Sequence, residues 1–184
     1  MSQRRWAEDD ADDRTLIERW QRGNERAATL LVERHAPAVA RYAASLGERD
    51  EVEEIVQDTF VRAFASLEGF RGESSLKTWL FTITRRLILD RRRAAGRRRQ
   101  VLALSEGDAV TEYDALDGLV ADEAERRMRA AVARLTPLQR EVFVLRVGEG
   151  LSYREIAEAT GTTEGAARVH YHNAVRQVKE FLDE

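Results

Sequence analysis

The sequence predicts an all-α protein of two small helical domains joined by a flexible acidic linker, with a helix-turn-helix in the second domain. Ala, Leu, Arg and Glu are abundant, and only two prolines occur in 184 residues; this composition favours helices. Apolar residues recur at helical spacing, and we find no convincing alternating strand pattern. We place the first domain at 8–96, the linker at 97–123 and the second domain at 124–184.

The first helices are expected before residue 47. Asp13 is placed to cap a helix whose apolar positions follow helical spacing. Gly23 indicates a break between that helix and the next one. Pro37 is expected to start or kink the following helix, which runs to Gly47. His35 stands alone before Ala36 and Pro37, and we interpret it as a surface histidine.

Two amphipathic helices of opposite charge follow, on either side of the segment RGESS. Asp50 and Glu53 resemble a capping box for the first helix. Its apolar stripe should face inward, and its outward positions are Glu54, Gln57, Asp58 and Val61. Ser74 or Ser75 caps the second helix. That helix is expected to bury Trp79, Leu80, Ile83 and Leu87, and to turn outward Thr82, Arg85, Arg86, Leu89 and Arg93.

Capping signals place the helices of the second domain. Thr136, Pro137 and Gln139 indicate one helix start, and Ser152 with Glu155 forms another capping box. Gly161 separates a short helix from a longer one that runs from about Thr163 to Phe181, which is the spacing of a helix-turn-helix. The residues left at its front are Thr163, Glu164, Arg168, His172 and Asn173.

Charge is sorted along the chain, although the net charge is only −3. Eight arginines and one acid lie between residues 85 and 99, whereas eight acids and no Lys or Arg lie between residues 100 and 125. One interpretation of the arginines is a solvated helix end, where positive charge favours the helix dipole. Their density beside two aromatic residues fits contact with phosphates and stacking on bases better.

Other classes of protein find less support. The chain has no cysteine, which excludes disulfides and Cys-based zinc sites and fits a reducing compartment. No apolar run is long enough to span a bilayer, and the N-terminus lacks the core of a signal peptide, so we expect a cytoplasmic protein without membrane insertion. Glu54 and Asp58 share a helical face, but no histidine has matching spacing, and His170 and His172 point apart. We therefore expect no metal.

Four segments, in this order, resemble the extracytoplasmic-function (ECF) group of bacterial sigma factors. DDRTLIERWQRGNERAATLLVERHAP is similar to the start of sigma region 2, and DEVEEIVQDTFVRAF to its core-binding helix. FRGESSLKTWLFTITRRLILDRRR resembles the promoter-melting segment, and LTPLQREVFVLRVGEGLSYREIAEATGTTEGAARVHYHNAV resembles region 4. The resemblance implies a subunit of RNA polymerase that directs the core enzyme to promoters and helps to open them, without catalysis or a cofactor.

The resemblance also implies roles for particular residues. The clamp helices of the beta-prime subunit would contact Glu54, Gln57, Asp58 and Val61. The −10 element would be bound and melted by Phe70, Arg71, Ser74, Trp79, Phe81, Arg85, Arg86 and Arg93. The −35 element would be bound by Arg154, Thr163, Glu164, Arg168, His170, His172, Asn173 and Arg176. The beta subunit and an anti-sigma factor are further implied partners.

Two parts of the chain qualify the resemblance. The acidic linker would thread through the polymerase active-site cleft, although a disordered spacer explains it equally well; its acids are Glu106, Asp108, Glu112, Asp114 and Asp117. Arg86 stands where relatives often carry Asn, and His170 and Asn173 stand where many carry Arg. The promoter sequences of better-known members therefore do not transfer.

Two other function classes remain open at this point. A stand-alone helix-turn-helix regulator would use residues 1–93 for sensing or dimerisation and would bind duplex tightly by itself. The second domain argues against this, because residues 136–184 hold six Lys or Arg and eight acids. A metal-dependent enzyme on the face from Glu51 to Asp58 lacks a plausible set of ligands.

Overall fold

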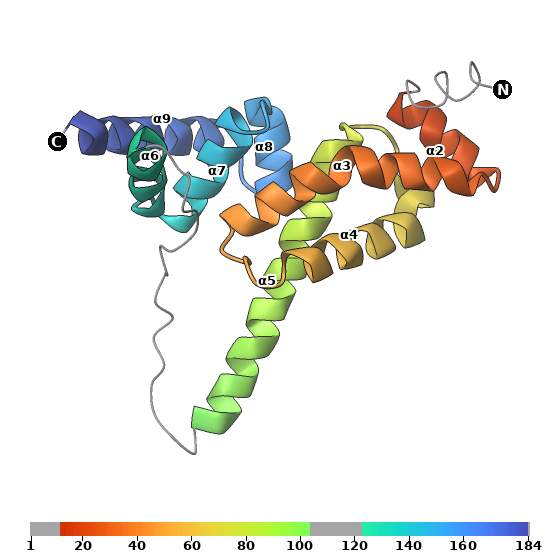
Figure 1. The fold of residues 1–184 in the computed structure, drawn as a ribbon, viewed down its shortest axis with the longest axis horizontal. Helices are drawn as coiled ribbons and strands as arrows, with labels where there is room; N and C mark the ends of the chain where they lie inside the picture. The colour runs from red at the N-terminus through yellow and green to blue at the C-terminus, as the bar shows by residue number, and fades with distance from the viewer. Residues whose placement is uncertain (1–11, 104–122, 184) are drawn as a thin grey trace. The chain divides into compact units, whose positions relative to one another are not determined.

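Helices are the sole regular secondary structure in residues 12–103 and 123–183, which are the residues that the computed structural model describes (Figure 1). The predicted all-α class is confirmed. The chain divides into two compact units, 1–87 and 88–184, and the boundary falls inside one long helix, α5 (Leu76–Ala103). Each unit has its own buried core.

Unit 1 contains three helices and a short 3-10 turn before α5. They are α2 (Asp13–Gln21), α3 (Glu25–Ser45), α4 (Val52–Ser66) and η1 (Leu67–Gly69). α3 packs against both α2 and α4. The first turns of α5 close the core, because the ring of Phe81 lies 4.8 Å from that of Tyr42 on α3. Thr84 on α5 also meets Thr59 on α4, with 3.3 Å between the hydroxyl oxygens.

The start of α2 differs from the prediction. Asp12, not Asp13, caps the helix, and its carboxylate accepts a hydrogen bond of 2.8 Å from the backbone N–H of Thr15. Asp13 is then free to reach α3. Its carboxylate lies 2.8 Å from Nη1 of Arg34 and 2.9 Å from Nε2 of His35. His35 is only 7% exposed, so its interpretation as a surface histidine was wrong.

The surroundings of Asp13 shift its titration. Burial alone would raise the pKa of the carboxyl, but the hydrogen bonds and positive charges of His35 and Arg34 outweigh burial and lower the pKa below its ordinary value of 3.8. The contact joins residues more than twenty positions apart and fixes the beginning of α2 on the middle of α3.

Two helix starts in unit 1 also differ from the prediction. Pro37 lies inside α3 and does not begin a helix. A proline costs one backbone hydrogen bond there, and the buried residues around it hold the helix together: Ala38, Val39, Tyr42 and Ala43. α4 begins after Glu51, which makes no side-chain cap, so the predicted capping box of Asp50 and Glu53 was wrong. Ser75 does cap α5, since its hydroxyl accepts a 3.1 Å hydrogen bond from Thr78 N–H.

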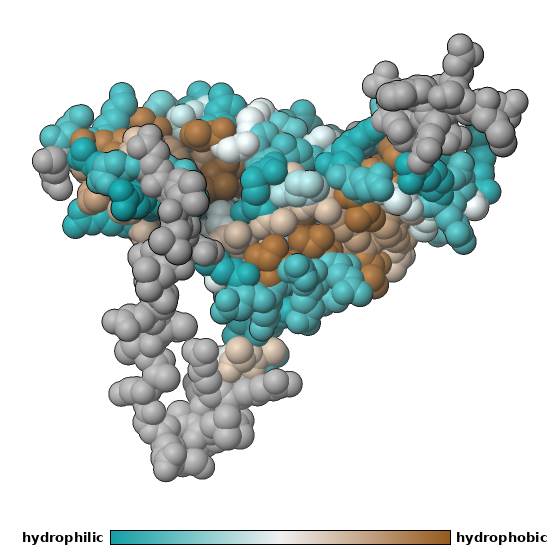
Figure 2. Space-filling view, in the orientation of Figure 1, coloured by the Kyte–Doolittle hydropathy of each residue, from teal (hydrophilic) through white to brown (hydrophobic). Residues whose placement is uncertain are grey.

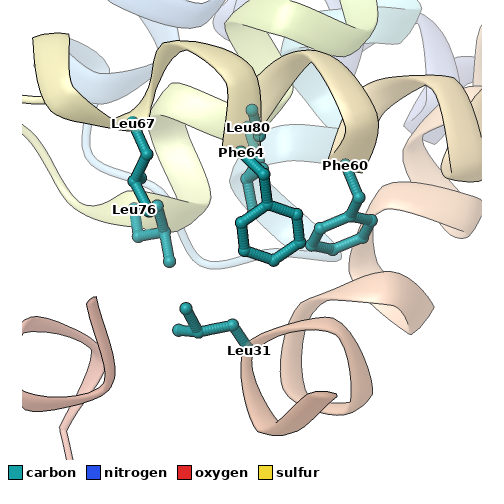
Figure 3. A pocket seen from close by; sticks show the side chains of 7 residues that line it. Leu31, Phe60, Phe64, Leu67, Leu76 and Leu80 are labelled. Atoms are coloured by element: carbon teal, nitrogen blue, oxygen red, sulfur yellow. The ribbon is translucent and has the colours of Figure 1, made fainter. Parts of the chain in front are cut away.

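An apolar pocket lies in unit 1 where α3, α4, η1 and α5 meet. Leu31 projects from α3 toward Phe60 and Phe64 of α4 (Figure 3). The remaining lining residues are Ala63, Leu67, Leu76 and Leu80. Figure 2 shows hydrophobic residues gathered in a strip on this face of the molecule, between more hydrophilic surfaces.

Unit 2 contains the rest of α5 and four further helices. They are α6 (Glu123–Ala133), α7 (Pro137–Val147), α8 (Tyr153–Thr160) and α9 (Glu164–Asp183). Both predicted capping boxes are present, at Thr136 with Gln139 and at Ser152 with Glu155. α9 packs against α6, α7 and α8 and is the central helix of this group. Its buried side chains are Ala167, Ala174 and Val178.

The region expected to be a linker is described only in part. α5 continues to Ala103, so residues 97–103, which we expected to belong to the flexible linker, are helical. Ala and Arg are good helix formers, and Gly96 alone does not end the helix. The acids proposed to enter the polymerase cleft lie outside the described residues: Glu106, Asp108, Glu112, Asp114 and Asp117.

Candidate nucleic-acid interface

The outward face of α4 presents the four residues expected there. Glu54, Gln57 and Val61 are exposed, and Asp58 is partly buried. Val61 is 61% exposed and so adds apolar surface to this acidic face. The opposite face of α4 is buried in the core, through Ile55, Thr59, Phe60 and Ala63. The packing therefore fixes which side of α4 faces solvent.

The loop between η1 and α5 is held by an aromatic pair. The rings of Phe70 and Trp79 lie 5.1 Å apart and are tilted by 48°. Both side chains are partly buried, so each still presents surface to solvent. Gly72 adopts a φ of +68°, a conformation that favours glycine and turns the chain sharply. Arg71 is exposed beside this turn, and Ser74 is partly buried.

Phe81 must be removed from the proposed DNA contacts. Its side chain is fully buried, at 0% exposure, against Tyr42. The sequence placed Phe81 near the arginines along the chain, but the helical turn directs it into the core of unit 1. Ile83, which was expected to be buried, is partly exposed, whereas Ile88 takes a core position. The buried face of α5 is therefore rotated from the predicted one.

The arginines of α5 do lie on its outer side. Arg86 and Arg93 are exposed, and Arg85 is partly buried. Arg93 lies 3.6 Å from Asp90, a surface ion pair that leaves most of the guanidinium in solvent. Because α5 continues beyond Arg93, Arg97 is also exposed on the same helix. Arg86, Arg93 and Arg97 are spaced by seven and four residues, which places them along one helical face.

α8 and α9 form the predicted helix-turn-helix. Gly161, with a φ of 68°, ends α8 in the left-handed conformation and turns the chain. The hydroxyl of Thr163 then accepts a 3.1 Å hydrogen bond from the N–H of Ala166 and caps α9. Most of the eight residues expected to bind the −35 element are exposed, namely Arg154, Thr163, Glu164, Arg168, His172 and Arg176. The other two, His170 and Asn173, are partly buried.

Two residues of the helix-turn-helix were missed by the sequence reasoning. Val169 is 59% exposed beside Arg168 at the front of α9. The ring of Tyr153 lies 5.2 Å from the guanidinium carbon of Arg168 and 4.9 Å from that of Arg146. The exposure of Val169 could have been predicted from the sequence, because its position does not fit the apolar stripe of α9. The contact of Tyr153 with two arginines on other helices has no local clue.

The described residues form neither a metal-binding cluster nor a membrane-spanning helix. No three His, Asp or Glu side chains there are grouped so that they could hold a metal ion. Within residues 12–103 and 123–183, no helix is long and apolar enough to cross a membrane.

Comparison with known proteins identifies the family. Sigma-70 region 2 matches residues 31–98, and Sigma-70, region 4 matches residues 125–178. An ECF RNA polymerase sigma-E factor of Haemophilus influenzae is 31% identical over 179 residues, which are 92% of this chain and 95% of that protein. The chain belongs to the ECF sigma factors. The predicted family and the prediction that the chain is not an enzyme are confirmed.

Further relatives agree with this sigma-factor assignment. The ECF RNA polymerase sigma-E factor of Escherichia coli is 30% identical over 93% of this chain and 92% of its own length. The sigma factor RpoE in complex with the anti-sigma factor NepR, from Bartonella quintana, matches with a TM-score of 0.69 and 30% identity over 84% of this chain and 93% of that one. CnrH in complex with the cytosolic domain of CnrY matches with a TM-score of 0.66 and 29% identity over 93% and 97%.

Proposed function

We propose that this ECF sigma factor joins core RNA polymerase through α4 and promoter DNA through the loop before α5, α5 itself and α9. The observation that carries the proposal is the exposure of three separate surfaces of different chemistry: an acidic face with Val61, an aromatic and arginine surface, and the front of a helix-turn-helix. Sigma factors act in promoter recognition, and each surface suits one of the contacts that this activity requires.

The α4 face suits the clamp helices of the beta-prime subunit. Glu54 and Asp58 supply negative charge, which attracts a basic partner and speeds its association. Val61 supplies apolar area that loses water on binding. Burial of the other side of α4 means that polymerase can use this face without unfolding the helix.

The loop before α5 suits a base drawn out of the −10 element. Phe70 and Trp79 offer partly exposed rings for stacking, and Arg71 and Ser74 lie beside them. Extruding a base costs a few kcal/mol, and stacking on an aromatic ring returns about 1–3 kcal/mol. Arg85, Arg86 and Arg93 then bind phosphates of the opened strand. Opening by binding energy alone requires no ATP.

The −35 element is read by α9 in the major groove. Arg168 is the candidate for a guanine edge, because its planar fork matches the two acceptors of that base. Its neighbours on the front of the helix-turn-helix are Thr163, Glu164, His170, His172 and Asn173. Arg154 and Arg176 are the phosphate contacts in this proposal. The protein works in the cytoplasm, where polymerase meets promoters.

An anti-sigma factor is a further proposed partner. The relative from Bartonella quintana was solved with the anti-sigma factor NepR. In this chain the exposed α4 face and the front of α9 are surfaces that such a partner would have to cover to block polymerase and DNA. The support is the likeness to that structure together with the exposure of these surfaces.

Binding to core and run-off transcription test the proposal together. Val61→Arg should abolish pull-down of core polymerase, because it puts a charge into the apolar centre of the contact. Arg86→Ala should retain core binding and lose promoter opening, measured by permanganate reactivity of unpaired thymines. Arg14→Glu is the matched control, since the side chain of Arg14 is 89% exposed on α2, a helix that supplies none of the proposed contacts. A wild-type chain that never binds core would end the proposal.

A further inference from the structure

Tyr153 holds an unusual place in the helix-turn-helix. It is the first residue of α8, directly after the capping box of Ser152 and Glu155. Its ring meets the edge of the Tyr171 ring at 6.0 Å, and Tyr171 stacks on Phe143 at 6.3 Å. The Tyr153 ring therefore packs against Tyr171 of α9, which is itself stacked on Phe143 of α7.

Two guanidinium groups lie over this ring, but they have different roles. Arg146 donates a 2.7 Å hydrogen bond from Nη1 to the carbonyl of Leu151, which closes the turn between α7 and α8. Arg146 is thus bound to the backbone and helps to place Tyr153. Arg168, by contrast, is 56% exposed and lies on the front of α9.

Arg168 is restrained twice while it remains exposed. Its Nη2 donates a 3.1 Å hydrogen bond to Oε1 of Glu164, one turn earlier on α9. Its guanidinium carbon lies 5.2 Å from the centre of the Tyr153 ring on α8. A ring face attracts the cation without occupying an N–H group, so donors remain for a base. Glu164 also offsets the positive charge that Arg146 and Arg168 bring to one ring.

We propose that Tyr153 is a positioning residue that sets the choice of base at one position of the −35 element by holding Arg168 in its reading conformation. A long arginine side chain loses rotamer freedom when it binds, and a side chain already held in place loses less. The proposal rests on the proposed function, in which α9 enters the major groove with Arg168 toward a guanine.

The test measures specificity rather than total affinity. Holoenzyme containing wild type, Tyr153→Phe, Tyr153→Leu or Arg168→Ala would be bound to promoters in which each −35 base pair is varied in turn. Arg168→Ala should remove discrimination at one base pair. Tyr153→Leu should reduce discrimination at that same base pair about two- to fivefold, the ratio expected for an exposed cation–π contact. Tyr153→Phe should keep it, because the ring face remains.

A second substitution distinguishes the effect of the ring's negative face from the effect of its volume. Pentafluorophenylalanine at position 153 keeps an aromatic ring of similar shape but reverses its negative face, so it should behave like Tyr153→Leu even where the leucine variant folds poorly. If either variant weakens binding equally at every −35 sequence, the role of Tyr153 is structural and the inference is wrong. A uniform loss of the same size in all three variants, with discrimination unchanged, would instead indicate a hydroxyl contact to phosphate, because all three lack the hydroxyl, and would also overturn it.

The experiment separates this inference from the function on which it rests. If Arg168→Ala changes discrimination at no base pair, the proposed reading of DNA by Arg168 fails. If Arg168→Ala changes one base pair but neither Tyr153→Leu nor the fluorinated ring does, only the positioning role fails.

Discussion

Single residues take their roles here from partners far away in sequence. Asp13 and His35 were both misread from the sequence, as a helix cap and as a surface histidine. The two side chains in fact bind each other at 2.9 Å, with Arg34 on the same carboxylate at 2.8 Å. A cap is a local feature, and either Asp12 or Asp13 fits it. The contact between α2 and α3 depends on the tertiary fold, which local patterns do not contain.

Asp13→Asn should lower the free energy of unfolding by about 1.5–3 kcal/mol near pH 5, the usual range for a hydrogen bond to a charged group. The lowered pKa means that Asp13 stabilises the fold fully above its unfolded value of 3.8, and that this contribution is lost as pH falls through the folded pKa. The difference in unfolding free energy between wild type and Asp13→Asn, measured by urea unfolding, should therefore become smaller from pH 5 to pH 3. Glu18→Gln is the control near pH 5, where loss of its exposed ion pairs of 3.5 and 4.0 Å should cost no more than about 1 kcal/mol.

At the scale of helices, the sequence predicted which helices exist and where they are capped. It predicted less well how long each helix is and which of its faces is buried. The capping boxes at Thr136 and Ser152 and the turn at Gly161 were right, because each depends on a few adjacent residues. α3 continues through Pro37 and α5 continues to Ala103, because packing and helix propensity override a single unfavourable residue. The face of α5 was misjudged at Phe81, since its apolar and aromatic residues are too dense to define one stripe.

Phe81→Ala tests the corrected face of α5. The side chain is fully buried against Tyr42, so its loss should cost about 3–5 kcal/mol of unfolding free energy through the cavity that remains. Arg86→Ala, five residues later on the exposed side, should change that free energy by no more than about 0.5 kcal/mol. Urea unfolding followed by circular dichroism would measure both. A stable Phe81→Ala protein that has lost only promoter opening would restore Phe81 to the DNA surface.

For the whole molecule, the positions of the charged residues along the chain say more about its binding surfaces than the net charge does. The exposed arginines of α5 and the acidic face of α4 form two different surfaces, whereas residues 136–184, which include the helix-turn-helix, hold more acids than basic residues. This division was visible in the sequence, because charge runs can be counted without a fold. Which side chains of each helix face outward was visible only in part, because Phe81 is buried in α5 and Val169 is exposed on α9.

The same distribution predicts weak binding of promoter duplex by the free protein. Residues 136–184 contain six Lys or Arg and eight acids, so few counterions are released on contact with DNA. We expect a Kd no tighter than about 10⁻⁶ M at physiological salt, the range of non-specific binding. Core polymerase should lower this Kd, because it holds the −10 and −35 contacts in register. Fluorescence anisotropy of a labelled promoter, with and without core, measures the difference. Nanomolar binding by the chain alone would favour a stand-alone helix-turn-helix regulator, because such a protein needs no polymerase to find its site.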